Sequence, residues 1–249
     1  RAQKKKWGSA FSKQYVKDGS GKIPTTEHTM LIGHFAVAFA AKKAAPKTSL
    51  GTLFLSVQFV DLLWPLFLLL GLEHVLVEVG NTAVTPLNFY DYPITHSLAG
   101  AVAWSLVFGG VYFALRNYKA GAWTVGLGVF SHWILDFITH RPDLPLGFGV
   151  DVFFGLGLWN SPAATVVVET ALYAAGLALY LRSTVAKDKS GRYGLWGLVV
   201  VLFLIYLANL FGPPPPNEEM IAIAGNASWL FVLWAYWVDK HRSVKETEA

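Results

Sequence analysis

The sequence predicts an all-α, polytopic integral membrane protein, a helical bundle of about seven transmembrane helices without strands. Apolar residues make up 54% of the 249 residues and charged residues only 14%, whereas an ordinary soluble domain has about 25% charged residues. The mean hydropathy is +0.43. Ten Trp and ten Tyr suit the aromatic belts at the two surfaces of a bilayer. This composition favours one membrane-embedded bundle over several soluble domains.

The successive spans follow from runs of about 20 apolar residues, the length that crosses a bilayer core. They are expected near 28–45, 50–71, 94–115, 120–140, 162–182, 194–212 and 220–238. The Gly-rich stretch 145–160 is apolar and is expected to form an interfacial or re-entrant loop. Pro213 to Pro216 predict a rigid break between the last two spans.

Three segments make up the predicted organisation: a basic extension over 1–29, the bundle over 30–240 and a polar C-terminal tail over 241–249. No cleavable signal peptide is expected, because the first apolar run begins only near Met30. In the extension, basic residues accompany Trp7, Phe11 and Tyr15 at four-residue spacing. Two interpretations stay open for it, an amphipathic helix on the membrane surface and a disordered leader.

Lys and Arg set the expected orientation. Basic residues cluster in the loops at 42–47, 116–119 and 182–192 and after 239, whereas loops 72–93 and 213–219 contain none. The basic loops are therefore expected inside. The extension conflicts with this if segment 28–45 crosses, because its seven basic residues then lie outside. The depth of His34 favours the crossing, and so an outside N-terminus. The net charge of +4 is modest, which indicates membrane orientation rather than nucleic-acid binding.

The stretch Ser131 to Asp143 carries the most informative polar residues. His132, Asp136 and His140 are four residues apart, so a helix places them on one face, inside a predicted span. Ionisable groups in a membrane are costly unless they are paired or bind something. Because the chain has no Cys, thiolate sites and disulfides are excluded. A His and a carboxylate one turn apart suit a divalent metal.

Three further spans bring His34, Asp61 and His96 to the same outer half of the bundle as His132 and Asp136. Each has a structural alternative. His34 can hydrogen-bond between helices, Asp61 can satisfy backbone groups freed by Pro65, and His96 can cap a helix. The convergence of all five, rather than any one pair, predicts a metal site.

Other ionisable residues are expected nearer the edge of this site. Asp91 and His140 lie at its mouth, and Asp143 is expected to form a turn. Glu169 lies deep in the fifth span, where it is either a general acid or base or the partner of a nearby His or Arg. The residues close to span ends are expected to be solvated, namely His28, His74, Glu73, Glu78 and His241.

These residues resemble the membrane-bound metal-dependent hydrolases, which are polytopic, mostly bacterial inner-membrane proteins distantly similar to zinc-dependent phospholipase C. The resemblance covers about 30–145. The motifs that carry it are Gly33-His34, Asp61 before Pro65, Thr95-His96-Ser97 and Ser131-His132-x-x-x-Asp136. It implies metal-ligand roles for His34, Asp61, His96, His132 and Asp136, to which spacing adds His140. Met30 is similar to the usual start of such proteins, so 1–29 is expected to be an addition.

Two positions depart from the family pattern. The family often has a carboxylate-rich Asp-x-x-Pro-Asp motif where this chain has Gln58 and a single Asp61. Asp91 stands where the family has the first His of His-Arg-Gly-x-Thr-His-Ser. These departures weaken the expectation of a two-metal cluster. A subgroup with its own substrate and a member without activity both stay open.

The predicted function is a membrane-embedded hydrolase that uses a divalent metal, Zn or alternatively Mn or Mg, on a phosphoester or lipid-like substrate at the membrane surface. Asp91 or Glu169 is the candidate general base or acid, and Arg141 the candidate group for an anionic substrate. The expected location is a bacterial or organellar inner membrane.

Two other functions compete with this one. The chain can be a non-catalytic accessory subunit of a larger membrane complex, contacting lipids and, through 1–29, other subunits. A transporter with a buried proton relay ranks last, because the sequence shows no inverted repeat.

Overall fold

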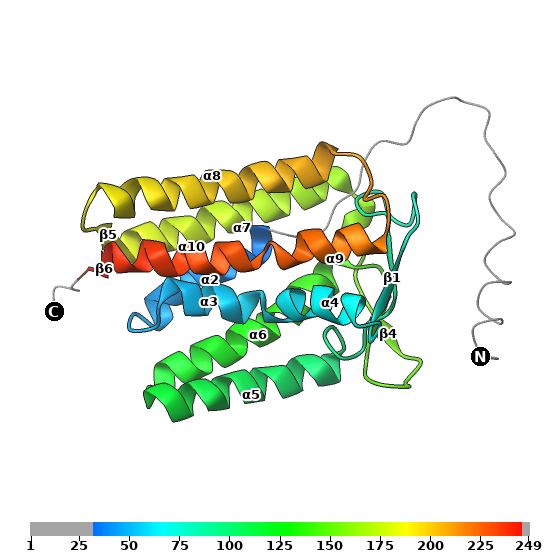
Figure 1. Cartoon of the computed structure of the whole chain (residues 1–249), viewed down its shortest axis with the longest axis horizontal. Coiled ribbons are helices and arrows are strands. Elements are labelled where there is room, and N and C mark those ends of the chain that lie inside the picture. The colour runs from blue at the N-terminus through cyan, green and yellow to red at the C-terminus, as the bar shows by residue number, and fades with distance from the viewer. Residues whose placement is uncertain (1–31, 246–249) are drawn as a thin grey trace, which may run out of the picture.

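The computed structural model describes residues 32–245, so the predicted extension 1–29 lies outside the described residues. The helices lie roughly side by side and form a bundle, with short strands at both of its ends (Figure 1). The helices are α2 (Ile32–Ala44), α3 (Leu50–Val57), α4 (Phe59–Leu69), α5 (Leu98–Arg116), α6 (Lys119–Thr139), α7 (Pro162–Ser183), α8 (Lys189–Phe211), α9 (Glu218–Asn226) and α10 (Trp229–Lys240), with a 3-10 turn η1 (Leu158–Asn160).

α2 lies at the centre of the bundle, packed against α3, α6 and α7. It has no polar face apart from its two ends, and such a helix is stable only when it is buried. Ile32, Phe35 and Phe39 are completely buried. The approach of α7 is close, because a Cβ added to Gly176 would lie 2.2 Å from the carbonyl oxygen of Ala36. This central helix carries His34 at its first turn.

Four helical segments are long and apolar enough to cross a membrane: α5, α7, α8 and the combined stretch Glu218–Lys240, which contains α9 and α10. A fifth is possible if α3 and α4, bent by 56° at their junction, form one span. The other two expected spans are helical but do not meet these criteria. α2 has only 13 residues, about 20 Å of helix, and the polar residues of α6 dilute its apolar character. The structure thus supports four to five spans, and seven stays an expectation.

The expectation of no strands is wrong for the described residues, which contain three antiparallel ladders. β1 (His74–Val77) pairs with β2 (Leu87–Asp91), and β3 (Leu144–Pro145) with β4 (Phe153–Phe154). β5 (Thr184–Ala186) pairs with β6 (Arg242–Val244) and so ties the start of the predicted C-terminal tail to the loop before α8. The short ladders satisfy backbone groups in connections that hydropathy alone cannot distinguish from plain loops.

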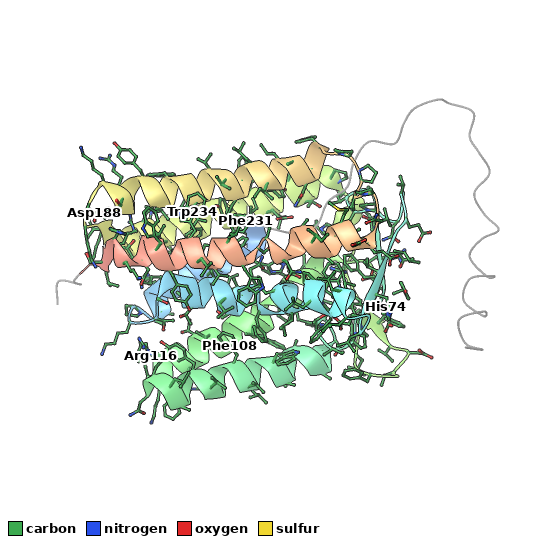
Figure 2. The ribbon with its side chains drawn as sticks, in the orientation of Figure 1. His74, Phe108, Arg116, Asp188, Phe231 and Trp234 are labelled. Carbon is green, nitrogen blue, oxygen red and sulfur yellow. The ribbon has the colours of Figure 1, made fainter. Side chains whose placement is uncertain are left out.

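The basic segments meet at one end of the bundle. There the ammonium group of Lys42 lies 2.8 Å from Asp239, and the Lys187 ammonium donates to the carbonyl of Lys240 at 3.1 Å. Figure 2 shows Arg116 and Asp188 at this end and His74 at the opposite end. The ladders β1–β2 and β3–β4 occupy that opposite end. The charge asymmetry predicted from the loops is therefore present in the fold.

Candidate metal centre

Three helices and the residue before the cap of α5 place five ionisable side chains at one level of the bundle. His34 lies in the first turn of α2, and His132 and Asp136 lie one turn apart on α6. Gln58 ends α3 and begins α4, so Asp61 falls in the first turn of α4. His96 directly precedes Ser97, whose hydroxyl caps α5 by accepting from the backbone N–H of Gly100. Helix periodicity and two helix starts thus direct these side chains toward one point.

The side chains converge as the sequence predicts. Asp136 Oδ1 lies 3.3 Å from His34 Nε2, and its Oδ2 lies 3.3 Å from His132 Nε2. Asp61 Oδ1 lies 3.4 Å from His132 Nε2 and 3.2 Å from His96 Nε2. The rings of His34 and His132 stack with their centroids 3.8 Å apart. The arrangement forms two groups that share His132, one with His34 and Asp136 and the other with Asp61 and His96.

Hydrogen bonds on the far side of two rings define their tautomers. The Nδ1 of His132 lies 2.7 Å from the carbonyl oxygen of Val57, which can only accept. When the imidazole is neutral, Nδ1 therefore carries the proton and Nε2 has a lone pair. Val57 ends α3 at the bend, where its carbonyl is available to accept this bond.

His96 is fixed by a relay through Thr95 to Glu73. The Glu73 carboxylate accepts from the backbone N–H groups of Ile94 and Thr95, at 2.7 and 2.9 Å, and from the Thr95 hydroxyl at 2.6 Å. Because this hydroxyl donates to Glu73, its oxygen accepts from Nδ1–H of His96, 2.6 Å away. When His96 is neutral, its Nε2 therefore carries a lone pair that faces Asp61.

The chemistry of this donor set fits a divalent metal. Neutral imidazole lone pairs that face carboxylate oxygens repel one another unless a cation or an additional proton lies between them. The donor atoms of a tetrahedral zinc site, at about 2.0–2.1 Å from the ion, are separated by about 3.3–3.4 Å. Three of the observed separations match that spacing: Asp61 to His96 at 3.2 Å, Asp61 to His132 at 3.4 Å and His132 to Asp136 at 3.3 Å. His96 Nε2 lies further from Asp136 Oδ2, at 3.9 Å.

Glu73 is the residue beside the His/Asp cluster that sequence reasoning missed. It is expected to be solvated, but its exposed fraction is only 1%. No local pattern marks it, because its partner Thr95 lies 22 positions further along the chain. Outer partners of this kind orient metal-binding imidazoles and raise their basicity.

His140, predicted as a ligand, lies outside both groups. α6 ends at Thr139, and the extended backbone of His140 turns its ring toward Asp143, with Nδ1 2.9 Å from Oδ1. The other Asp143 oxygen accepts from Arg141 at 3.2 Å, and the Tyr92 hydroxyl donates to Oδ1 at 3.3 Å. Burial lowers the pKa of His140, but the Asp143 carboxylate outweighs it, so the pKa is raised above the ordinary value.

None of the three predicted catalytic residues belongs to the two His/Asp groups. Asp91 is on β2 and pairs with His74 at 2.8 Å. Arg141 donates to Asn88 as well as to Asp143. Glu169 is completely buried in α7. None of the three lines the cavity that adjoins the His/Asp cluster in the described part of the chain.

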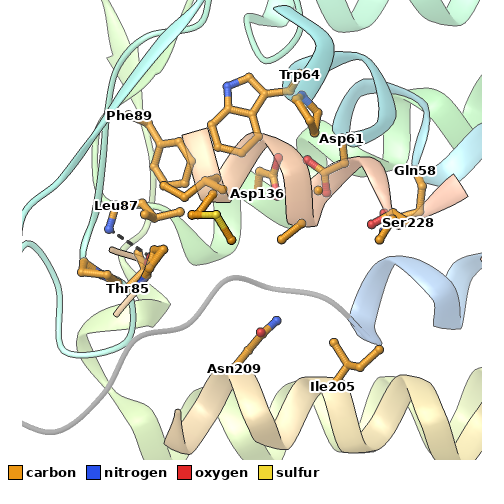
Figure 3. Close-up of a pocket in the computed structure, with 18 of the residues that line it drawn as sticks. Gln58, Asp61, Trp64, Thr85, Leu87, Phe89, Asp136, Ile205, Asn209 and Ser228 are labelled. Atoms are coloured by element: carbon orange, nitrogen blue, oxygen red, sulfur yellow. Dashed lines mark hydrogen bonds between the residues drawn. The ribbon is translucent and has the colours of Figure 1, made fainter. Parts of the chain in front are cut away.

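A cavity of about 420 Å³ opens beside the cluster. Asp61, His96, Asp136 and His140 form part of its wall. Asp61 is the most accessible carboxylate of the cluster, with 31% of its side chain exposed against 5% for Asp136. Figure 3 shows Asp61 and Asp136 on one side of this space and Ile205 and Asn209 of α8 on the other. Of the cluster carboxylates that line the cavity, Asp61 is therefore the one most accessible to a small molecule.

Comparison with known proteins gives one result. The family described as YdjM inner membrane protein matches residues 25–213, about three quarters of the chain. No curated protein and no solved structure is significantly similar to it.

Proposed function

We propose that this chain, which belongs to the YdjM inner membrane protein family, is a membrane-embedded metal-dependent hydrolase. Its inner-membrane location accords with its several apolar helices of membrane length. The observation that carries the proposal is the pair of His/Asp groups sharing His132, in which imidazole lone pairs face carboxylates beside a cavity.

Asp61, His96, His132 and Asp136 would hold the ion, with His34 as a further donor to Asp136 or to the metal. When bound, a divalent ion supplies Lewis-acid chemistry and activates water for attack on a phosphoester. The accessible Asp61 presents this centre to the cavity. The buried partners exclude water from the other sides, which strengthens every charge interaction within the site.

His140 is the group best placed to move a proton. It lines the cavity, and its Nδ1 is held by Asp143, which leaves Nε2 for exchange with substrate. We assign it the acid–base role for which the sequence suggests Asp91 or Glu169, because neither of those lines the cavity. Arg141 then positions Asp143 rather than binding substrate directly.

The membrane arrangement that accompanies this function has seven spans, with α2 and α6 added to the five candidates. The basic end lies inside and the cavity end outside. Since the chain has no Cys, single cysteines introduced at 20 and 190 report the topology by labelling from each side. Position 20 is expected to react from outside and position 190 from inside. Reaction of both from one side would exclude this topology.

The test of the enzyme is hydrolysis of bis(p-nitrophenyl) phosphate by the full chain, with metal supplied. His132→Ala and Asp136→Asn should remain inserted and lose both turnover and bound metal. The matched control is His241→Ala, which removes the imidazole of another His–Asp pair, 2.7 Å from Asp188 at the basic end. Equal activity in His132→Ala and wild type would refute the proposal. A wild type without metal or turnover would favour the accessory-subunit function instead.

A further inference from the structure

We propose that the cavity binds a single-chain amphiphile, an alkyl phosphoester whose phosphate end lies at the His/Asp cluster and whose chain lies along α8 and α9. This inference rests on the proposed function and names its substrate class. The juxtaposition that supports it is a polar wall from α4 and α6 opposite an apolar wall from α8 and α9.

The lining of the cavity changes character from one side to the other. Ionisable residues gather where α4, α6 and the start of α5 meet, at Asp61, His96 and Asp136. The wall from α8 to α10 is mostly apolar, with Ile205, Met220, Ile221 and Phe231, and its polar members Asn209 and Ser228 are uncharged. Trp64 of α4 and Trp159 of η1 add apolar surface beside the ionisable residues. In Figure 3 Ile205 faces the carboxylates of Asp61 and Asp136 across the space. A ligand that satisfies both walls has a charged end and an aliphatic end.

The size of the cavity limits its occupant. About 420 Å³ lies at the lower part of the range for small-molecule sites. It therefore takes one chain and its head group, not a folded polypeptide or a lipid with two long chains.

The outer surface beside the cavity is apolar as well. Phe211 of α8 is 74% exposed, and Ile223 and Met220 of α9 are 51% and 44% exposed. α8 and the Glu218–Lys240 segment are long and apolar enough to cross a membrane, so in the proposed arrangement these side chains would face hydrocarbon. These apolar side chains lie beside the exposed Glu218 and Glu219 of the first turn of α9. The surface next to the cavity thus offers both an apolar route for an aliphatic chain and a polar rim, which favours an amphiphile over a water-soluble phosphoester.

The phosphate end and the aliphatic chain of the ligand should bind by different interactions. The carboxylates of Asp61 and Asp136 repel a phosphate unless a cation lies between them. Binding of the phosphate end should thus depend on metal. The apolar wall contains no such charges, so the chain contributes through burial of its methylene groups.

A photo-crosslinking experiment tests the inference on the full, metal-loaded chain in detergent. The probe is decyl phosphate with a diazirine near the end of its chain, and unlabelled decyl phosphate and inorganic phosphate are the competitors. Labelling should map to peptides containing Met220, Ile221 or Phe231, and chelation should reduce it. Decyl phosphate should compete, whereas inorganic phosphate at the same concentration should not.

Two variants separate the cavity from the lipid-facing surface. Ala224 lines the cavity, so Ala224→Phe fills part of it. If the larger side chain excludes about two methylene groups of the probe, the affinity for decyl phosphate should fall roughly tenfold. Ile223→Phe enlarges the neighbouring exposed side chain, which does not line the cavity, and should label as wild type does.

Equal labelling of the two variants would overturn the inference, and so would competition by inorganic phosphate as strong as that by decyl phosphate. Turnover of bis(p-nitrophenyl) phosphate with no labelling of the cavity would refute the amphiphile alone and leave the hydrolase intact. Two results together would refute both the phosphate placement and the proposed function. The first is that the purified chain binds no metal, and the second is that decanol, which lacks a phosphate, reduces labelling as strongly as decyl phosphate does.

Discussion

The two ends of the bundle use buried charge in different ways. At the basic end each buried cation has its own acceptors: Lys42 contacts Asp239 and the carbonyl of Thr48, and Arg242 donates to Thr184 and to the carbonyl of Gly191. In the His/Asp cluster the Nε2 atoms of His132 and His96 carry lone pairs toward the carboxylates when these two rings are neutral. The first arrangement needs no further partner, whereas the second needs an added cation or an additional proton.

Removal of one carboxylate should lower metal content in the His/Asp cluster and leave it unchanged at the basic end. Asp136→Asn weakens a ligand of the cluster and should abolish stoichiometric metal binding, while Asp239→Asn should leave it unchanged. The measurement is metal content of each purified variant by mass spectrometry. If Asp239→Asn lost metal to the same degree, the contrast between the two ends would be wrong.

The relay from Glu73 should affect the metal less than a ligand does. Glu73→Gln can donate to Thr95 and so disturb the direction of the hydrogen bonds that place the His96 proton on Nδ1. Loss of such an outer partner typically costs about 10- to 100-fold in metal affinity. The affinity can be measured by competition with a chelator.

Glu78→Gln is the matched control for that experiment, because the exposed Glu78 accepts a hydrogen bond from the Asn88 amide in the same hairpin. An unchanged affinity in Glu73→Gln would show that the relay does not position His96.

At the basic end, Lys42→Met should lower the free energy of unfolding and leave the metal content unchanged. The substitution keeps an apolar stem but removes the 2.8 Å contact with Asp239 and the bond to Thr48. Hydrogen bonds of charged groups contribute about 1.5–3 kcal/mol, so a loss of about that size is expected. Thermal or denaturant unfolding in detergent measures it, with the exposed Lys43→Met as control. A drop in metal content in Lys42→Met would contradict the separation of the two ends.

His140 should show the smallest effect, a shift in protonation. Its folded pKa is raised, so the stabilisation from Asp143 is fully present below the unfolded pKa of about 6.5 and is lost as pH rises through the folded pKa. The groups that act on it are Asp143, Asp136 and Asp61. In metal-free protein, NMR of the His140 ring should give a midpoint above that of an unperturbed histidine. Asp143→Asn should lower this midpoint and Asp151→Asn, in the nearby loop, should not.

Several features could be predicted from sequence because they follow from helix geometry. The i to i+4 spacing of His132 and Asp136 places them together, and the charge of the loops predicts the basic end. His140 continues that spacing, but the helix ends at Thr139, so the period no longer determines where its side chain points. Helix ends are the least certain element of such a prediction.

Other features depend on contacts that no local pattern contains. Hydropathy identifies apolar runs but cannot tell a helix that faces lipid from one buried by its neighbours, and α2 is the second kind. The β1–β2 hairpin and the burial of Glu73 depend on pairing between 72–79 and 85–95 across the cavity end. These pairings join residues that are distant in sequence, so only the tertiary fold determines them.

The central claim is that a metal ion completes the His/Asp cluster, and X-ray absorption by the metal in the purified full chain tests it most directly. The account predicts about one ion per chain, with only nitrogen and oxygen ligands, at least two of them imidazoles, at about 2.0–2.2 Å. His132→Ala should lose this signal and His241→Ala should keep it. A wild-type chain that binds no divalent metal when supplied with zinc or manganese would contradict the account.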